Sequence, residues 1–185
     1  MLGLVLTAGL TTASLSSTAL LSDEAANTST VTTGKVDIAT TPATALFAAP
    51  NMRPGERFIS PIQVLNSGDA ELRYSVLSTT AAGGDALASQ MRLTVRSGVT
   101  DCTTSGFTAT GTVVYGPGVL GSAAGTAIIG SVAQGQQAGD RVLATGASEM
   151  LCVQMAMPPV WNSAYQGLSA SLTMTFNAEQ TRNNP

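Results

Sequence analysis

The feature that most constrains the fold is a two-residue alternation near the carboxyl end of the chain. Over residues 168–176, every second side chain is apolar and each one between is Ser or Thr. A period of two places these sets on opposite faces of a β-strand. The segment therefore predicts a strand with one face in a core and one in water. Its apolar face holds Leu168, Ala170, Leu172, Met174 and Phe176.

The same period recurs over residues 149–157. Here Cys152 lies opposite the apolar face, so we expect any disulfide from it to pin a covering loop outside the sheet rather than fill the core. The apolar face holds Leu151, Val153, Met155 and Met157.

Shorter apolar segments punctuated by Gly, Pro, Asn and Asp predict further strands. They cover residues 31–38, 58–65, 72–77, 91–96 and 110–115, with a weak one at 126–129. Turn signals separate them at residues 53–56, 66–69, 82–85 and 138–140. The one helix signal is residues 85–90, because Asp85 suits an N-cap.

Composition supports an all-β chain. Ala, Thr, Ser and Gly dominate, while aromatic residues make up 4% and charged residues 10% of the 185 positions. Such a chain has few of the Glu and Lys residues that favour helices, and it is long enough for one core. We therefore predict one jelly-roll-like β-sandwich of about seven to nine strands. Residues 116–139 are rich in Gly, Ala, Ser and Gln, and we interpret them as a long excursion from it.

Several function classes are excluded or disfavoured. The chain contains no His, which excludes Ser-His-Asp, Cys-His and HExxH chemistry. Its net charge of -3 and pI near 4.7 exclude a nucleic-acid binder. Gly116, Gly118 and Gly121 match G-x-G-x-x-G literally, but Pro117 falls inside the motif and no helix signal follows it. We expect no enzymatic activity and no cofactor.

The amino end predicts export. Residues 1–22 carry no charge, and residues 2–10 have the character of a signal-peptide apolar region. Small residues suit a cleavage site between Ala19 and Leu20. No Lys or Arg precedes the apolar run, as expected if the chain begins inside a longer precursor. The alternative is a buried apolar strand.

Two cysteines, Cys102 and Cys152, either form a disulfide in an oxidising compartment or are separate buried thiols in a reducing one. The predicted export favours the disulfide. It would close a loop of about 50 residues, worth on the order of 4 kcal/mol in the chain-entropy model.

Three further patterns have weak functional interpretations. Asp69 and Glu71 near Asn66 could form a cation site, although a solvated turn explains them better. Trp161 and Tyr165 form either a ligand platform or ordinary packing over one end of the sandwich. A glycosylation sequon at residues 27–29 is short enough to arise by chance.

Four blocks, taken in order, resemble the TasA and camelysin group of bacterial exported proteins, which a SipW-type signal peptidase processes. Residues 18–23 resemble the cleavage region, with Leu20 and Leu21 in place of aromatics. Residues 27–38 resemble the N-x-T-F-x-x-G-T-L-D-L strand. The other two blocks are the L-K-P-G-D and N-x-G turns at residues 52–57 and 65–68, and the closing strand, residues 165–180, with its F-x-A-x-Q ending.

Residues 97–150 match this family only loosely, and the cysteine pair is not typical of its best-known members. The chain therefore resembles a divergent branch. The resemblance implies a signal peptide over residues 1–19, a donor strand over residues 20–38 and a sandwich over residues 39–185. Within the donor segment, the assembly strand would be carried by Val31, Gly34, Val36 and Ile38.

The expected function is a secreted subunit of an extracellular or biofilm-matrix fibre. In such a fibre the Thr-rich donor strand completes the sheet of the next subunit head to tail, which generates an open filament. We expect no nucleic-acid partner and no stable membrane anchor after processing. The alternatives are a monomeric secreted module that binds a surface glycan or protein, and a camelysin-like peptidase.

Overall fold

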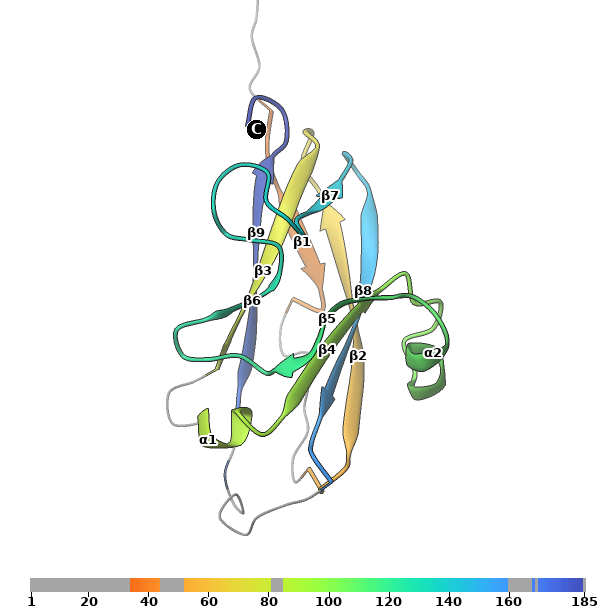
Figure 1. The fold of residues 1–185 in the computed structure, drawn as a ribbon. Helices are drawn as coiled ribbons and strands as arrows, with labels where there is room; N and C mark the ends of the chain where they lie inside the picture. The colour runs from red at the N-terminus through yellow and green to blue at the C-terminus, as the bar shows by residue number, and fades with distance from the viewer. Residues whose placement is uncertain (1–33, 44–51, 81–84, 160–167, 169, 185) are drawn as a thin grey trace, which may run out of the picture. The chain divides into compact units, whose positions relative to one another are not determined.

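A computed structural model describes residues 34–43, 52–80, 85–159, 168 and 170–184. Internal contacts divide the chain into two units, residues 1–32 and residues 33–185. The described part of the second unit contains nine β-strands and two short helices, arranged as two antiparallel sheets packed face to face (Figure 1). The predicted all-β sandwich is confirmed.

Sheet A has five strands and places segments far apart in sequence side by side. Its spatial order is β1 (Ile38–Thr41), β2 (Arg57–Asn66), β8 (Ser148–Ala156), β4 (Arg92–Ser97) and β5 (Thr112–Val119). All of its pairings are antiparallel. The central strand, β8, pairs with β2 on one side and β4 on the other.

Sheet B is built around β3 (Leu72–Thr80). One side of β3 pairs with β9 (Leu172–Gln180) over nine consecutive residues. The other side pairs in turn with β7 (Arg141–Leu143) and β6 (Thr126–Ile129). The helices, α1 (Asp85–Ala88) and α2 (Thr104–Ala109), lie in the connections before and after β4.

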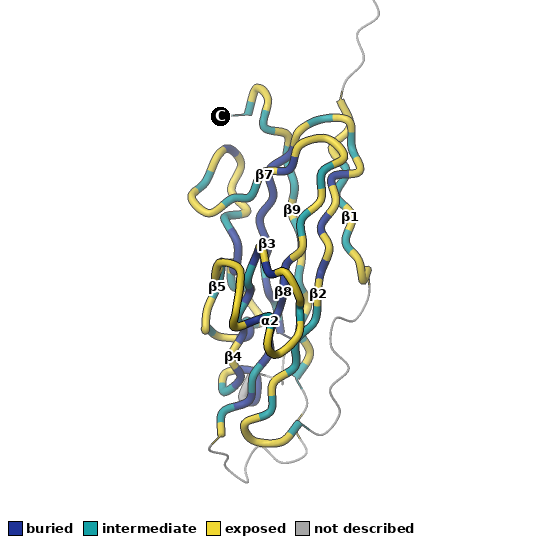
Figure 2. Tube along the Cα trace, turned by 90° about the vertical axis from the view of Figure 1, so that its right-hand side faces the viewer, coloured by how far each residue is buried: buried dark blue, intermediate teal, exposed yellow. Residues whose placement is uncertain are grey.

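The core fills the space between the sheets. Tyr74 and Val76 of β3 face Leu151 and Val153 of β8, and all four are at most 1% exposed. In Figure 2 the buried residues concentrate along β3 and β8, whereas the residues of β1 alternate between intermediate and exposed. Burying one such side chain stabilises the fold by roughly 1.5–3 kcal/mol. The apolar faces of these alternating strands thus form the core between the two sheets.

Five strand predictions, residues 58–65, 72–77, 91–96, 126–129 and 149–157, coincide closely with β2, β3, β4, β6 and β8. The prediction for residues 110–115 falls on β5, which continues to Val119, and the helix prediction for 85–90 falls on the shorter α1. The sequence did not predict β7 or α2.

Two boundaries were predicted wrongly. The last strand begins at Leu172 rather than Leu168, because its partner β3 ends at Thr80, which is opposite Leu172. Of the predicted segment 31–38, residues 34–37 precede the first described strand, which begins at Ile38, and residues 31–33 lie outside the described residues. A strand extends only as far as a neighbouring strand can satisfy its backbone groups.

Candidate functional site

Residues 34–37, which precede β1, lie beside the turn between β2 and β3. The backbone N–H of Lys35 donates to Oδ1 of Asp69 at 2.5 Å, and the N–H of Asp69 donates to the Lys35 carbonyl at 3.1 Å. The N–H of Ser67 donates to the Asp37 carbonyl at 2.9 Å. The stretch before β1 therefore follows a turn of its own subunit, and not a strand.

The proposed assembly residues fall in different settings. Gly34 and Val36 are exposed, while Ile38 begins β1 and packs against the core. Val31 and the predicted cleavage site at Ala19 and Leu20 lie outside the described residues. The structure therefore ties the end of the predicted donor segment to its own sandwich, through the pairing of β1 with β2.

An exposed ion pair marks this junction. Nζ of Lys35 donates to Oδ2 of Asp37 at 2.5 Å. This hydrogen bond raises the pKa of Lys35 and lowers the pKa of Asp37. Both side chains are well exposed, so solvent screens the pair and its contribution to stability is small.

Cys102 and Cys152 form a disulfide, as the sequence favoured. Cys152 packs with Val99 and Phe107 in a small apolar cluster separate from the main core. Leu151 and Val153, its neighbours along β8, point instead into the space between the sheets. The disulfide thus pins a covering segment that includes α2 onto the outer face of sheet A, as predicted.

Polar contacts strengthen this covering segment. The N-cap residue of α2, Thr103, accepts a hydrogen bond from the N–H of Gly106 at 3.2 Å. The Arg96 guanidinium lies 5.6 Å from the ring centroid of Phe107, and its Nη2 donates to the Gly111 carbonyl at 3.0 Å. A cation over an aromatic face adds about 0.5–1 kcal/mol at a partly exposed site.

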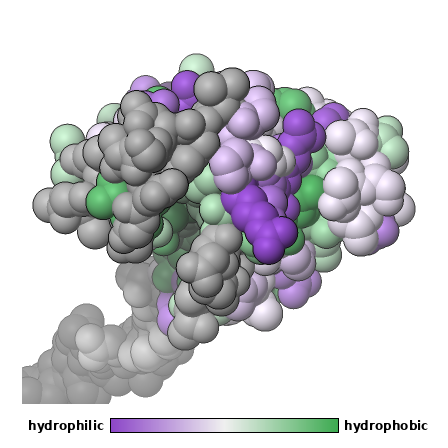
Figure 3. All heavy atoms as spheres, turned by 90° about the horizontal axis from the view of Figure 1, so that it is seen from below, coloured by the Kyte–Doolittle hydropathy of each residue, from purple (hydrophilic) through white to green (hydrophobic). Residues whose placement is uncertain are grey.

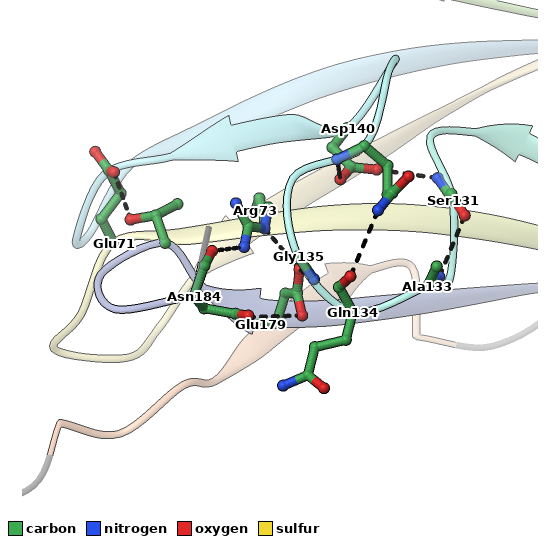
Figure 4. A network of polar contacts seen from close by, with 11 residues as sticks. Glu71, Arg73, Ser131, Ala133, Gln134, Gly135, Asp140, Glu179 and Asn184 are labelled. Atoms are coloured by element: carbon green, nitrogen blue, oxygen red, sulfur yellow. Dashed lines mark hydrogen bonds and ion pairs between the residues drawn. The ribbon is translucent and has the colours of Figure 1, made fainter.

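A second covering segment lies on the outer face of sheet B. Arg73 of β3 is only 4% exposed, and its Nε donates to Oε1 of Glu179 on β9 at 2.6 Å (Figure 4). The same carboxylate accepts from the N–H of Gly135 at 3.1 Å and from Nδ2 of Asn184 at 2.8 Å. Nη2 of Arg73 also donates to the Asn184 carbonyl. These contacts lower the pKa of Glu179, mainly through the hydrogen bond from Arg73.

Asp140 shapes the loop that makes this contact. Its Oδ1 accepts from the N–H of Ser131 at 3.0 Å, and its Oδ2 accepts from the N–H of Gln137 at 2.8 Å (Figure 4). A Cβ on Gly130 would lie 2.2 Å from Oδ1 of Asp140 at a φ of +57°, so this approach requires glycine. The carboxyl end of the predicted Gly-rich excursion is therefore an ordered cover for sheet B.

A cavity of about 90 Å³ lies beneath this loop. Arg73 and Glu179 satisfy each other there, and Asp140 is satisfied by backbone N–H groups. The charged side chains that line the cavity therefore hold the loop in place, and each of them is already hydrogen-bonded within the protein. Other residues that line it are Tyr74, Ser75, Ser131, Val132, Ala133, Asn177 and Ala178.

An internal polar network joins the two sheets. The buried Tyr74 hydroxyl donates to Oε1 of Glu149 at 2.5 Å. Arg141 donates from Nε and Nη2 to the same carboxylate at 2.6–2.9 Å. Burial, reinforced by the hydrogen bond to Glu149, raises the pKa of Tyr74 well above its ordinary value. Because the phenol stays protonated, it acts as a permanent hydrogen-bond donor between the sheets.

The possible cation site at the β2–β3 turn is used for structure. Nδ2 of the fully buried Asn66 donates to the carbonyls of Ala70 and Leu143 at 2.9 and 3.0 Å. Glu71 accepts from the Thr181 hydroxyl at 2.7 Å. Within the described residues, no group of three His, Cys, Asp or Glu side chains could hold a metal ion.

Gly116 and Gly118 of the glycine-rich motif lie on β5, Gly121 follows that strand, and no helix begins there. A Cβ on Gly116 would lie 2.1 Å from the Leu93 carbonyl oxygen, so glycine permits close pairing with β4.

Trp161, Tyr165 and the sequon at residues 27–29 lie outside the described residues. In the part of the chain that the structure describes, no helix is long and apolar enough to cross a membrane.

The contacts between Arg73 and Glu179, and between Tyr74, Arg141 and Glu149, were not predicted. Their partners lie 106, 75 and 8 positions apart, and no local motif links them. The exposed surface carries few charges, as the composition implies. Seen from below, strongly hydrophilic and hydrophobic side chains form small separate groups in the coloured part of the surface (Figure 3).

No protein-family model matches this chain, and no curated protein sequence matches it. The described structure itself assigns the chain to the all-β sandwiches, with a disulfide-pinned cover on one sheet and an ion-paired loop on the other.

Proposed function

We propose that this chain is a secreted structural protein, the subunit of an extracellular fibre that assembles by donor-strand exchange. The observation that carries the proposal is the position of β1, which contains Ile38 at the end of the predicted donor segment. Among the described residues, β1 is an edge strand of sheet A and pairs with β2 alone. A segment that joins its sandwich through an edge strand can be exchanged with a neighbouring subunit.

The chemistry of the segment fits this role. Residues 25–33 contain no charged residue and are rich in Thr, so as an added strand they would meet no charge repulsion. The point at which the segment joins the sandwich also fits, because β1 lies at an edge of sheet A. Exchange of the preceding residues would leave the central strands undisturbed.

The disulfide supports an extracellular location. Cys102 and Cys152 are bonded, and disulfides persist in oxidising compartments. Together with the uncharged apolar amino end, this favours secretion, with cleavage between Ala19 and Leu20. A covalently pinned cover would also protect a subunit that functions outside the cell.

Negative-stain electron microscopy tests the fibre proposal. The chain from Leu20 is compared under non-reducing conditions with a chain that starts at Gly34. The shorter chain lacks residues 20–33 of the donor segment but keeps β1 and the contacts of Lys35 with the β2–β3 turn. Melting curves by circular dichroism establish that the shorter chain is folded. A third sample contains the shorter chain with a synthetic peptide of residues 20–33.

We expect filaments from the longer chain, single particles from the shorter one, and binding of the peptide to the shorter chain. Single particles from both chains would overturn assembly by the isolated protein and would favour a monomeric binding module. Filaments from both chains would overturn the role of the donor segment.

A further inference from the structure

The edges of the two sheets differ in how well they are protected against pairing with another strand. At one edge of sheet A, β1 has four residues and ends before Pro42; at the other, β5 contains Pro117 and two register shifts against β4. In sheet B, β6 and β7 have only four and three residues. Short strands, prolines and irregular pairing all discourage the addition of another strand.

The edge at β9 has none of these protections. Among the described residues, β9 pairs only with β3, in register over nine residues without a bulge. From Leu172 to Ala178 it contains no charge, no Pro and no Gly. Its first charged residue, Glu179, is held by Arg73. A long, regular and uncharged edge of this kind is a template for another strand.

We propose that the β9 edges of two copies of this chain pair antiparallel about a two-fold axis at Thr175. In that register Thr175 lies opposite its own copy, Met174 opposite Phe176, and Leu172 opposite Ala178. Polar residues also meet polar residues, since Thr173 lies opposite Asn177. Such an interface is isologous, because the same strand supplies both sides.

Because the sequence of β9 is self-complementary in this register, the strand that pairs with its edge is the β9 of a second copy. The inward side chains of β9 pack against the core but stay partly exposed, because sheet B ends there. Continuation of the sheet into a second copy would cover them with their own counterparts. Cross-strand pairs of this kind contribute roughly 0.2–1 kcal/mol each. The absence of charge matters most, because two identical charged edges would repel each other across the axis.

This contact is separate from donor-strand exchange. It uses residues 172–178, needs no part of the donor segment, and closes after two copies. In a fibre it would join two filaments side by side through sheet B. Either contact can therefore form when the other does not.

Cysteine cross-linking of the chain from Leu20 tests the pairing. The native cysteines are bonded to each other, so an introduced cysteine is the one free thiol. Residues directly opposite in antiparallel strands have Cα atoms about 4.5–5.5 Å apart, within the range of a disulfide. In Thr175→Cys the two introduced thiols lie opposite each other on the outer face. In Thr173→Cys or Asn177→Cys they lie four residues apart, or about 14 Å.

On non-reducing gels, we expect a disulfide-linked dimer from Thr175→Cys and monomers from Thr173→Cys and from Asn177→Cys. A mixture of the last two variants, one carrying a size tag, should give only the mixed dimer. Circular dichroism melting curves confirm that each variant is folded. These results do not depend on filaments, so a cross-linked chain without filaments would overturn the fibre proposal and retain this one.

A folded Thr175→Cys variant that stays monomeric would overturn the pairing. Equal cross-linking of all three single variants would also overturn it, because it would indicate random collision. To test the competing occupant, Thr175→Cys is mixed with a chain carrying Val31→Cys. A mixed dimer in place of the Thr175→Cys homodimer would assign the β9 edge to the donor segment.

Discussion

Tyr74 and Glu149 join the two sheets of the sandwich, since the phenol on β3 donates to the carboxylate on β8 at 2.5 Å. Tyr74 is 1% exposed, and Arg141 of β7 holds the other side of the carboxylate. Glu149 is partly buried, and a carboxylate in such a position is tolerated when its oxygens are hydrogen-bonded. This contact fixes how the inner faces of the two sheets meet.

Removal of the phenol oxygen should weaken this contact between the sheets without leaving the Glu149 carboxylate unpaired. In Tyr74→Phe, Glu149 keeps its hydrogen bonds to Arg141, so we expect the free energy of unfolding to fall by about 1–2 kcal/mol. Urea denaturation measures this change. Tyr115→Phe is the matched control, because its hydroxyl donates to the Val119 carbonyl on the exposed edge strand. We expect the control to change stability by about 0.5 kcal/mol or less. Equal losses in both variants would contradict a special role for the inter-sheet bond.

The disulfide should account for a large share of the stability. It joins residues separated by 50 positions, and its loss should lower the free energy of unfolding by about 4 kcal/mol in the chain-entropy model. The variant with Cys102→Ala and Cys152→Ala tests this by urea denaturation, with and without a dithiol reductant. The reductant should destabilise the wild-type chain and leave the double variant unchanged. A reductant-sensitive double variant would assign the effect to something other than the disulfide.

The outer ion pair of sheet B should make the fold sensitive to acid. Arg73 holds the pKa of Glu179 below its ordinary value of 4.5, so the unfolded chain binds this proton more tightly than the folded chain. The stabilisation is therefore present above about pH 4.5 and is lost as the pH falls through the lower pKa of the folded state. Glu179→Gln should reduce the melting temperature at pH 7 and flatten its fall in acid.

Asp37→Asn is the matched control for this acid dependence. Lys35 lowers the pKa of Asp37 through a hydrogen bond, but both side chains are exposed and screened by solvent. We expect a much smaller change of melting temperature at pH 7 than for Glu179→Gln. An unchanged melting temperature of Glu179→Gln at pH 7 would contradict the stabilising role of the contact between Arg73 and Glu179.

Alanine substitutions at Gly116 and Gly146 distinguish the backbone cost of a positive φ from the added cost of a steric clash. Both have φ between +71° and +84°, but a Cβ on Gly116 would lie 2.1 Å from the Leu93 carbonyl oxygen, and a Cβ on Gly146 would meet nothing within 4 Å. Gly146→Ala should therefore cost only the backbone term, about 1–2 kcal/mol. Gly116→Ala should cost clearly more, because β5 must move away from β4. Thermal unfolding measures both, and equal losses would contradict the close pairing of these two strands.

Several parts of the fold could be predicted because their signals are local. The alternation in residues 149–157 identified β8 and placed Cys152 opposite Leu151 and Val153, since a period of two depends only on strand geometry. The turn at Gly139 was equally clear, because glycine readily adopts the positive φ of +88° found there.

Other parts depended on partners remote in sequence. The strand predicted from residue 168 begins at Leu172 because β3 ends opposite that residue. The helix α2 was missed because its one buried residue, Phe107, gives no helical period and packs instead against Cys152.

The sequence by itself determined the all-β class, most strand positions and the side of β8 on which Cys152 lies, because alternation and turn residues act over a few neighbouring positions. Only the tertiary structure decided which strands became edges, that Arg73 would meet Glu179, and that Tyr74 would meet Glu149. These pairings depend on the packing of segments up to 106 positions apart. The free energy of a contact between such segments depends on both segments and on how the fold brings them together.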